Sequence, residues 1–209
     1  MSIESEVARV LLEIGAVGFN PQQPITFKSG IKSPIYVDNR RLPFHPAHWR
    51  IVIEGFRTLI EREQIQPDVV AGIETAGIPH SAALAYASGL PSVFVRKQPK
   101  EHGTRSRIEG GDVANLRVLL VEDLVTTGGS SLSGVVALRE AGAVVEHCFA
   151  IISYGFKEAR RAFDEADVTL HTLTSFDHIL KAAGDTIDQA IIRDWLRDPY
   201  GWTERHGLT

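Results

Sequence analysis

Two adjacent carboxylates, Glu122 and Asp123, stand between an apolar run and a turn rich in hydroxyl groups and glycine. The turn, 126–131, reads Thr-Thr-Gly-Gly-Ser-Ser and offers backbone N–H groups, hydroxyl donors and glycines that let the main chain approach an anion closely. A helix that begins near Ser130 would add the positive end of its dipole, so a phosphate is the expected ligand. An acidic pair beside such an anion site suits a ligand with vicinal hydroxyls and a phosphate, as in a ribose 5-phosphate.

A simpler interpretation of the same turn is a helix cap. A cap needs only one Asp, Thr, Ser or Gly residue, because its side chain satisfies the first free N–H groups of the helix. Here two carboxylates are followed closely by six hydroxyl or glycine residues in a row, which favours a ligand site. The turn is not a nucleotide-binding P-loop, because no Gly-Lys-Ser/Thr follows its glycines and the four-residue spacer is absent.

Alternating strands and helices must position these groups. Residues 118–121 are an unbroken run of Val and Leu, typical of a strand covered on both faces in a parallel sheet. Further strands are expected at 68–73, 91–95, 144–152 and 168–173, the last at an edge. Helices are expected at 2–15, at 45–63, from the turn at 74–79 to about 88, at about 130–142 and at 157–166, and the segment 182–197 is expected to be mostly helical. This alternation predicts right-handed crossovers, a parallel sheet and the α/β fold class.

Two turns should meet at one edge of that sheet. Open α/β sheets bind ligands at the carboxyl ends of their strands, where the acidic pair lies. The glycine-containing turn at 72–77 follows another strand, and its backbone amides can hold a diphosphate. In the helix after the acidic pair, Val135, Val136 and Leu138 are expected to face the sheet.

The segment 96–111 is basic and has no apolar periodicity. It holds five Lys or Arg residues and two Glu, a net charge of +3 in a chain whose formal charge is −4. Paired glycines end it, and the pattern predicts a mobile loop. Such a run is usually a solvated surface, and its charge alone does not assign it a ligand.

Composition narrows the class of protein. With 209 residues, 44% of them hydrophobic and 23% charged, the chain is typical of one globular domain, which we divide into 1–45, 46–175 and 176–209. The negative charge argues against nucleic acid or an anionic membrane as the main partner. Cys148 is the only cysteine, so an internal disulfide and a cysteine-based zinc cluster are excluded. We find no signal peptide or membrane span, and we expect a cytoplasmic protein.

The stretch 117–131 closely resembles the 5-phosphoribosyl-1-diphosphate (PRPP) signature of the type I phosphoribosyltransferases. The resemblance implies their fold, a Rossmann-like central parallel sheet flanked by helices, with a small hood built from the N-terminal segment. It also implies that the signature binds the phosphoribosyl group through a continuous set of residues: Glu122, Asp123, Leu124, Val125, Thr126, Thr127, Gly128, Gly129 and Ser130.

Two further motifs narrow the resemblance to the orotate phosphoribosyltransferases. Residues 27–40 contain Phe-Lys-Ser-Gly and then Ser-Pro-x-Tyr-x-Asp-x-Arg, similar to the hood of that family. The likeness implies that Lys28 reaches the substrate pocket and that Tyr36 and Val37 lie near the pyrimidine base. Residues 96–103 read Arg-Lys-x-x-Lys-x-His-Gly, which resembles the family's catalytic loop. In that family the loop closes over the diphosphate of a neighbouring subunit, which implies a homodimer that shares residues 96–111.

The activity implied is transfer of the 5-phosphoribosyl group from PRPP to N1 of orotate, giving orotidine 5′-monophosphate and diphosphate. Glu122 and Asp123 would hold the ribose hydroxyls and stabilise positive charge on the ring. The diphosphate would be neutralised by a basic set made up of Arg96, Lys97, Lys100 and His102. Lys100 and His102 are the catalytic candidates beside the acidic pair, and His102 can donate a proton to the leaving group. Mg²⁺ is implied as the cofactor, bound through substrate phosphates and not through a protein cage.

The chain departs from the family at two places, and these leave alternatives open. Thr75 and Ala76 stand where the family often has an aromatic residue and a lysine, which removes one possible phosphate contact. Residues 153–156, Ser-Tyr-Gly-Phe, stand where the best-known members place an arginine for the orotate carboxylate. The carboxylate would then need backbone amides, Thr126 or Lys28. Uracil, cytosine or a purine remains possible as the base, and so does a regulator that binds PRPP without catalysis.

Overall fold

A six-stranded sheet forms the centre of the computed structural model, which describes residues 2–27, 30–98 and 106–207. The strand order is β10-β9-β8-β5-β6-β7. The five parallel strands are β5 (Val69–Ile73), β6 (Ser92–Val95), β8 (Val118–Val125), β9 (His147–Ser153) and β10 (Thr169–Thr174). The short β7 (Ile108–Glu109) pairs antiparallel with β6 at one edge. The predicted α/β class, the parallel core and the edge position of β10 are confirmed.

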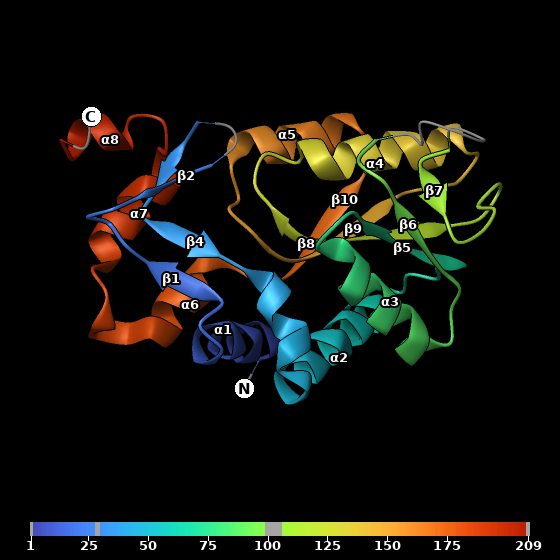
Figure 1. The fold of residues 1–209 in the computed structure, drawn as a ribbon, viewed down its shortest axis with the longest axis horizontal. Helices are drawn as coiled ribbons and strands as arrows, with labels where there is room; N and C mark the ends of the chain where they lie inside the picture. Colours follow the sequence, from blue (N-terminus) through green and yellow to red (C-terminus); the bar gives the residue numbers. More distant parts are fainter. Residues whose placement is uncertain (1, 28–29, 99–105, 208–209) are drawn as a thin grey trace.

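Helices cover both faces of this sheet, as Figure 1 shows. On one face lie α4 (Gly129–Glu140) and α5 (Lys157–Glu165); on the other lie α2 (Pro46–Arg62) and α3 (Gly77–Ser88). Side chains of β8 alternate between the two cores: Leu119 and Val121 join the core on one side, and Val118 and Leu120 join the core on the other. Burial on both faces explains why this strand is a continuous apolar run.

The N-terminal segment forms the hood beside the sheet. It contains α1 (Ile3–Glu13) and two small antiparallel pairs, β1 (Val17–Phe19) with β4 (Ile35–Val37) and β2 (Ile25–Thr26) with β3 (Lys32–Ser33). The 3₁₀ helix η1 (Asn39–Phe44) leads from the hood into α2. Ser2 caps α1, because its hydroxyl accepts a hydrogen bond from the Ser5 N–H.

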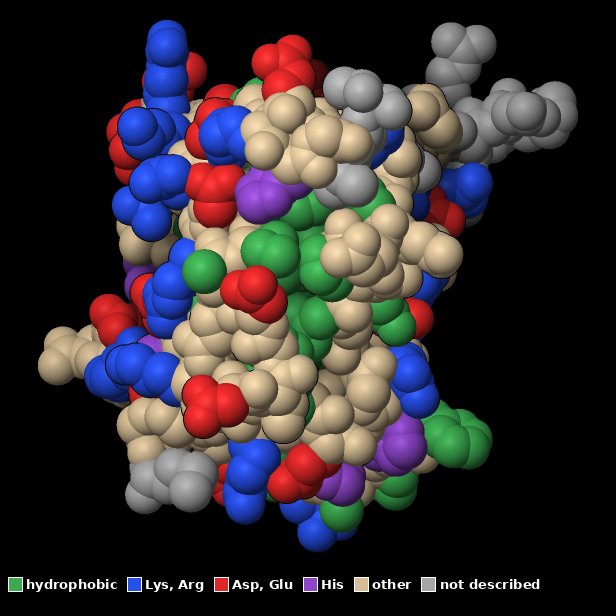
Figure 2. Space-filling model, turned by 90° about the vertical axis from the view of Figure 1, so that its left-hand side faces the viewer, with side chains coloured by type: hydrophobic (Ala, Val, Ile, Leu, Met, Phe, Trp, Pro, Cys, Tyr) green, Lys and Arg blue, Asp and Glu red, His purple; other side chains and the backbone are tan. Residues whose placement is uncertain are grey.

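The C-terminal helices pack against this hood. They are α6 (Phe176–Ala183), α7 (Gln189–Arg197) and α8 (Trp202–Arg205). Trp195, fully buried, donates its indole N–H to the Lys32 carbonyl oxygen at 2.7 Å, which joins α7 to β3. Figure 2 views the molecule from this side: hydrophobic side chains gather near the middle of the face, and charged side chains surround them. The hood and the C-terminal helices therefore form a second layer beside the sheet.

Several boundaries differ from the sequence prediction. The expected loop 96–111 contains β7, whose two residues are too few to show a period. The segment 182–197, expected to be mostly helical, contains the end of α6, the short 3₁₀ helix η2 (Gly184–Thr186) and α7, and α6 itself begins earlier, at Phe176. Val136 is 54% exposed and does not face the sheet, whereas Val135 and Leu138 are buried there. Cys148 is fully buried in β9.

Within the described ranges, no helix has the length and apolar character needed to cross a membrane.

Candidate active site

A cavity of about 540 Å³ opens where β8 passes into α4. One wall is the whole predicted anion turn together with the two residues before it, Leu124–Ser131. Gly128 takes a positive φ of 86° at the N-cap of α4, a conformation that glycine adopts without strain. The first turn of α4 therefore presents its N–H groups beside the cavity, which is the arrangement that binds phosphate at helix N-termini.

The opposite wall comes from the hood and from the residue that follows β9. These lining residues are Ile25, Phe27, Tyr36, Val37, Arg40 and Tyr154. Phe27 lies against Tyr154, with ring centroids 5.3 Å apart, and Tyr154 stacks on Phe176 at 4.8 Å. Aromatic walls of this kind suit a flat heterocycle. The cavity thus combines an anion site with a surface for a planar ring.

The acidic pair adjoins this cavity at the end of β8. Glu122 is 6% exposed and Asp123 is half-buried, and the Asp123 N–H donates to Glu122 Oε1 at 3.1 Å. Asn39, buried in η1, donates its side-chain N–H to the Asp123 carbonyl oxygen at 2.8 Å. This bond ties the hood to the acidic end of the central strand.

The surroundings of both carboxyl groups oppose ionisation. Burial raises the pKa of Glu122 well above its usual range, and the neighbouring Asp123 raises it further, while Lys97 acts in the opposite direction. Burial also raises the pKa of Asp123, although hydrogen bonds and the charge of Arg40 oppose that change. A ligand that brings hydroxyl donors or positive charge to the pair would therefore stabilise its ionised form.

The second predicted turn lies at the same edge of the sheet, as expected. It follows β5, which pairs with β8 in the register Gly72 to Val121. Glu74 in this turn accepts a hydrogen bond from the Lys97 N–H at 2.8 Å, which joins the turn to the end of β6. The Glu74–Thr75 peptide bond is cis.

Three predicted residues, Lys28, Lys100 and His102, lie outside the described residues. Of the remaining basic candidates, Arg96 forms an ion pair with Glu109 at 3.4 Å. Lys97 lies close enough to Glu122 to affect the pKa of that carboxyl group. The structure thus places Lys97, at the end of β6, near the acidic pair on β8, with the end of β5 between them, while Arg96 is held against β7.

Sequence reasoning did not assign a role to three residues that contact this region. Phe27 and Arg40 stand inside the motif at 27–40, so their place in that motif was the available signal. Tyr154 was noticed only as a departure from the family. Its position on the cavity wall depends on the packing of β9 beside β8, which no local pattern encodes.

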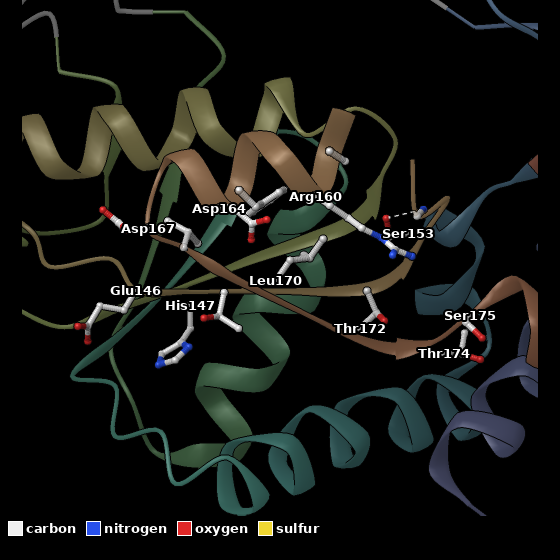
Figure 3. Close-up of a pocket in the computed structure, with 15 residues that line it drawn as sticks. Glu146, His147, Ser153, Arg160, Asp164, Asp167, Leu170, Thr172, Thr174 and Ser175 are labelled. Carbon is white, nitrogen blue, oxygen red and sulfur yellow. Dashed lines mark hydrogen bonds between the residues drawn. The ribbon is translucent and has the colours of Figure 1, made fainter. Parts of the chain in front are cut away.

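A larger cavity, about 880 Å³, lies along β10 and α5. Figure 3 shows its polar lining, with Arg160 directed toward Ser153 at one end and Glu146 at the other. No residue predicted for the site lines it. It lacks the strand-to-helix turn that provides the anion site at the end of β8.

The side chains near the acidic pair offer few ligands for a metal ion. Among residues 2–27, 30–98 and 106–207, no group of three or more His, Cys, Asp or Glu side chains is placed to hold one. Two adjacent carboxylates remain, Glu122 and Asp123. This sparse set fits Mg²⁺ bound mainly by substrate oxygens and water, and it does not fit a cage built by the protein.

Comparison with known proteins decides the family. The model of the phosphoribosyl transferase domain matches residues 43–188. The orotate phosphoribosyltransferase of Coxiella burnetii is 41% identical over 207 residues, covering 97% of this chain and 99% of that protein. The protein of the same name from Listeria innocua is 42% identical over 207 residues, with the same coverage of both chains. The chain belongs to the orotate phosphoribosyltransferase family.

Solved structures agree with this family assignment. The orotate phosphoribosyltransferase of Aeropyrum pernix has a TM-score of 0.74 at 28% identity, covering 84% of this chain and 96% of that chain. The UMP synthase of Leishmania donovani has a TM-score of 0.79 at 25% identity, covering 93% of this chain but 42% of that longer one. The fold and the family inferred from the sequence motifs are therefore confirmed, whereas the roles of individual residues remain predictions.

Proposed function

We propose that this chain transfers the 5-phosphoribosyl group of PRPP to N1 of orotate, giving orotidine 5′-monophosphate and diphosphate for pyrimidine nucleotide synthesis. The observation that carries the proposal is the shared cavity, in which the anion turn at 126–131 faces the aromatic walls of the hood. A 5-phosphate on the turn and a base against Phe27 and Tyr36 would bring the sugar carbon and the base nitrogen together. The names of the relatives favour orotate over other bases.

The acidic pair would act on the sugar. When the bond between ribose C1′ and the diphosphate oxygen breaks, its electron pair leaves with the diphosphate and positive charge develops on the ring. Glu122 and Asp123 would accept hydrogen bonds from the 2′- and 3′-hydroxyls and stabilise that charge. The N1 lone pair of orotate then forms the new bond to C1′, and the N1 proton passes to solvent water.

The basic residues would act on the leaving group. Lys97 at the end of β6 and the glycine-containing turn after β5 lie on the same side of the acidic pair, which suits a diphosphate there. Lys100 and His102 would complete this site when the loop closes, and His102 would protonate the departing diphosphate. Arg96 would bind the diphosphate after its ion pair with Glu109 breaks.

We further propose that Mg²⁺ binds with the substrate. When bound, the ion would neutralise charge on the diphosphate and leave Glu122 and Asp123 to orient the sugar. We also propose a homodimer in which residues 96–111 of one subunit reach the site of the other. The cytoplasmic location expected from the sequence stays a prediction.

The proposal is tested by following the absorbance of orotate with and without PRPP and Mg²⁺. We expect consumption of orotate only when both are present. Replacing Asp123 by Asn should lower kcat by about 10²–10³, the usual effect of removing a group that stabilises charge in the transition state. Circular dichroism should show an unchanged fold, and Asp185→Asn, an exposed aspartate on η2, is the matched control.

Two results would contradict the proposal. Near-normal turnover by Asp123→Asn would show that the Asp123 carboxylate does not act at the ribose. If the wild-type protein binds PRPP but leaves orotate unchanged, uracil, cytosine and adenine should be tried in the same assay. Turnover of one of these would indicate another base, and turnover of none would indicate a regulator that binds PRPP.

A further inference from the structure

Arg40 is the one charged side chain among the described residues that line the cavity where β8 passes into α4. It lies in η1, directly after the hood strand β4 that carries Tyr36 and Val37. The other described lining residues are apolar, aromatic, hydroxyl-bearing or glycine. A guanidinium on such a wall is suited to an anionic group of the ligand.

The guanidinium of Arg40 is oriented by its neighbour. Its Nε donates to Asp38 Oδ1 at 2.5 Å, and this ion pair holds one edge of the group. The two terminal nitrogens have no hydrogen-bond partner within the described part of the chain. Two parallel N–H donors on one end of a guanidinium match the two oxygens of a carboxylate.

The anions of the two substrates can be assigned in turn. The 5-phosphate has the amides of the turn at 126–131, and the diphosphate has Lys97 and the turn after β5 on the far side of the acidic pair. The carboxylate of orotate is the remaining anion. Its ring would lie against the same hood wall that carries Arg40.

The segment after β9, where the best-known family members have an arginine, supplies no cation to this cavity. Tyr154 faces the cavity but is packed among aromatic rings, and the Ser153 hydroxyl accepts the Gly155 N–H at 3.1 Å. Figure 3 shows that Arg160, in the next helix, is directed toward Ser153 within the larger cavity along β10. A cation for orotate must therefore come from another element.

We propose that Arg40 binds the carboxylate of orotate end-on and so distinguishes orotate from bases that lack this group. The proposal rests on the proposed function, because it assigns a specificity residue to the same site. Asp38 is a positioning residue that keeps the terminal nitrogens of Arg40 directed at the ligand. The hood thus supplies the charge that the segment after β9 lacks.

Nucleotide binding tests this assignment without turnover. Orotidine 5′-monophosphate carries the carboxylate and uridine 5′-monophosphate lacks it, while the rest of the two nucleotides is the same. Dissociation constants for both are measured by calorimetry with the wild-type protein, Arg40→Gln and Arg40→Lys. We expect Arg40→Gln to weaken binding of the carboxylated nucleotide about 10- to 100-fold, as for the loss of a charged hydrogen bond, with uridine 5′-monophosphate unchanged.

Arg40→Lys and two further variants sharpen the result. Arg40→Lys keeps the charge without the paired donors, so we expect a smaller loss in the same direction. Asp38→Ala should also reduce the preference for the carboxylated nucleotide, because it removes the oxygen that accepts the hydrogen bond from Arg40 Nε. Arg50→Gln, an exposed arginine on α2, is the matched control and should change neither constant.

The possible failures are distinguishable. If Arg40→Gln weakens the binding of both nucleotides equally, Arg40 contacts the phosphoribosyl group that they share, and the proposal is wrong. It is also wrong if the preference survives in Arg40→Gln and disappears in Lys28→Gln, because Lys28 is then the carboxylate's partner. If the wild-type protein itself shows no preference for the carboxylated nucleotide, the proposed function fails with it. Circular dichroism of each variant separates these outcomes from loss of folding.

Discussion

Glu122 is a carboxyl group held where water hardly reaches it. Its side chain is buried at the end of β8, Asp123 is its sequence neighbour, and both circumstances raise its pKa. Such a group is poorly stabilised when it ionises without a ligand. Ribose hydroxyls would supply the missing hydrogen-bond donors, which gives a physical reason for acids at this point.

This burial predicts a pH-dependent stability difference between the wild-type protein and Glu122→Gln. Because its pKa is raised, the Glu122 carboxyl group binds its proton more tightly in the folded state than in the unfolded state. The stability that this contributes is fully present below pH 4.5 and is lost as the pH rises through the raised pKa. Gln has a similar shape and does not ionise. We therefore expect the melting temperature of the variant, relative to wild type, to increase as the pH is raised.

Thermal melts across a series of buffers, from acid to alkaline, measure this difference. Glu61→Gln, an exposed glutamate on α2, is the control for the loss of a carboxylate elsewhere. If the difference in melting temperature between Glu122→Gln and wild type is the same at every pH, burial does not raise the pKa of this carboxyl group.

At the scale of elements, the site depends on the close approach of α3 to β8. A Cβ atom added at Gly77 would lie 2.6 Å from the Val121 carbonyl oxygen and 3.4 Å from the Glu122 Cα. A side chain at position 77 does not fit unless the backbone moves, because the atom that its Cβ meets first is the main-chain oxygen of Val121. Gly77 therefore lets the turn after β5 lie directly beside the acidic end of β8.

Replacing Gly77 by Ala should destabilise the protein by about 1–3 kcal/mol, as overpacking of a close contact usually does. Urea denaturation measures the free energy of unfolding. Gly129→Ala is the matched control, since a Cβ there meets nothing within 4 Å, and its stability should stay near that of the wild type. Equal unfolding free energies for the two variants would contradict this account of the contact.

At the scale of the whole molecule, the C-terminal helices support the wall of the site that the hood and Tyr154 form. Trp195 packs edge-on against Phe27 and Tyr154, with ring centroids 6.1 Å and 5.4 Å apart. These three rings come from the hood, from α7 and from the end of β9. The aromatic surface that would receive the base is thus assembled from three distant parts of the chain.

The proposed sharing of the loop between subunits predicts complementation. A Lys100→Ala chain and an Asp123→Asn chain should each be nearly inactive alone. After mixing and exchange of subunits, each heterodimer would have one site with neither substitution, so we expect orotate turnover to return. Turnover that stays at the level of the separate variants would indicate that the loop serves its own subunit's site.

Most of the central sheet could be predicted from the sequence, because its signals are local. Apolar runs marked the strands β5, β6 and β8, and glycines marked the turns that follow them. The short β7 was missed, since two residues carry no periodicity, and the exposure of Val136 was missed because it depends on how α4 is rotated against the sheet.

The sequence by itself determined the chemistry at the end of β8: acids, hydroxyls and glycines occur in one continuous run, so chain connectivity alone brings them together. Only the tertiary structure decided what faces that run. Asn39 reaches Asp123 across 84 residues of chain, and Arg40 and Tyr154 line one cavity through the packing of the hood against the sheet. Such contacts are decided by the burial of apolar surfaces between distant elements, which no local pattern of residues records.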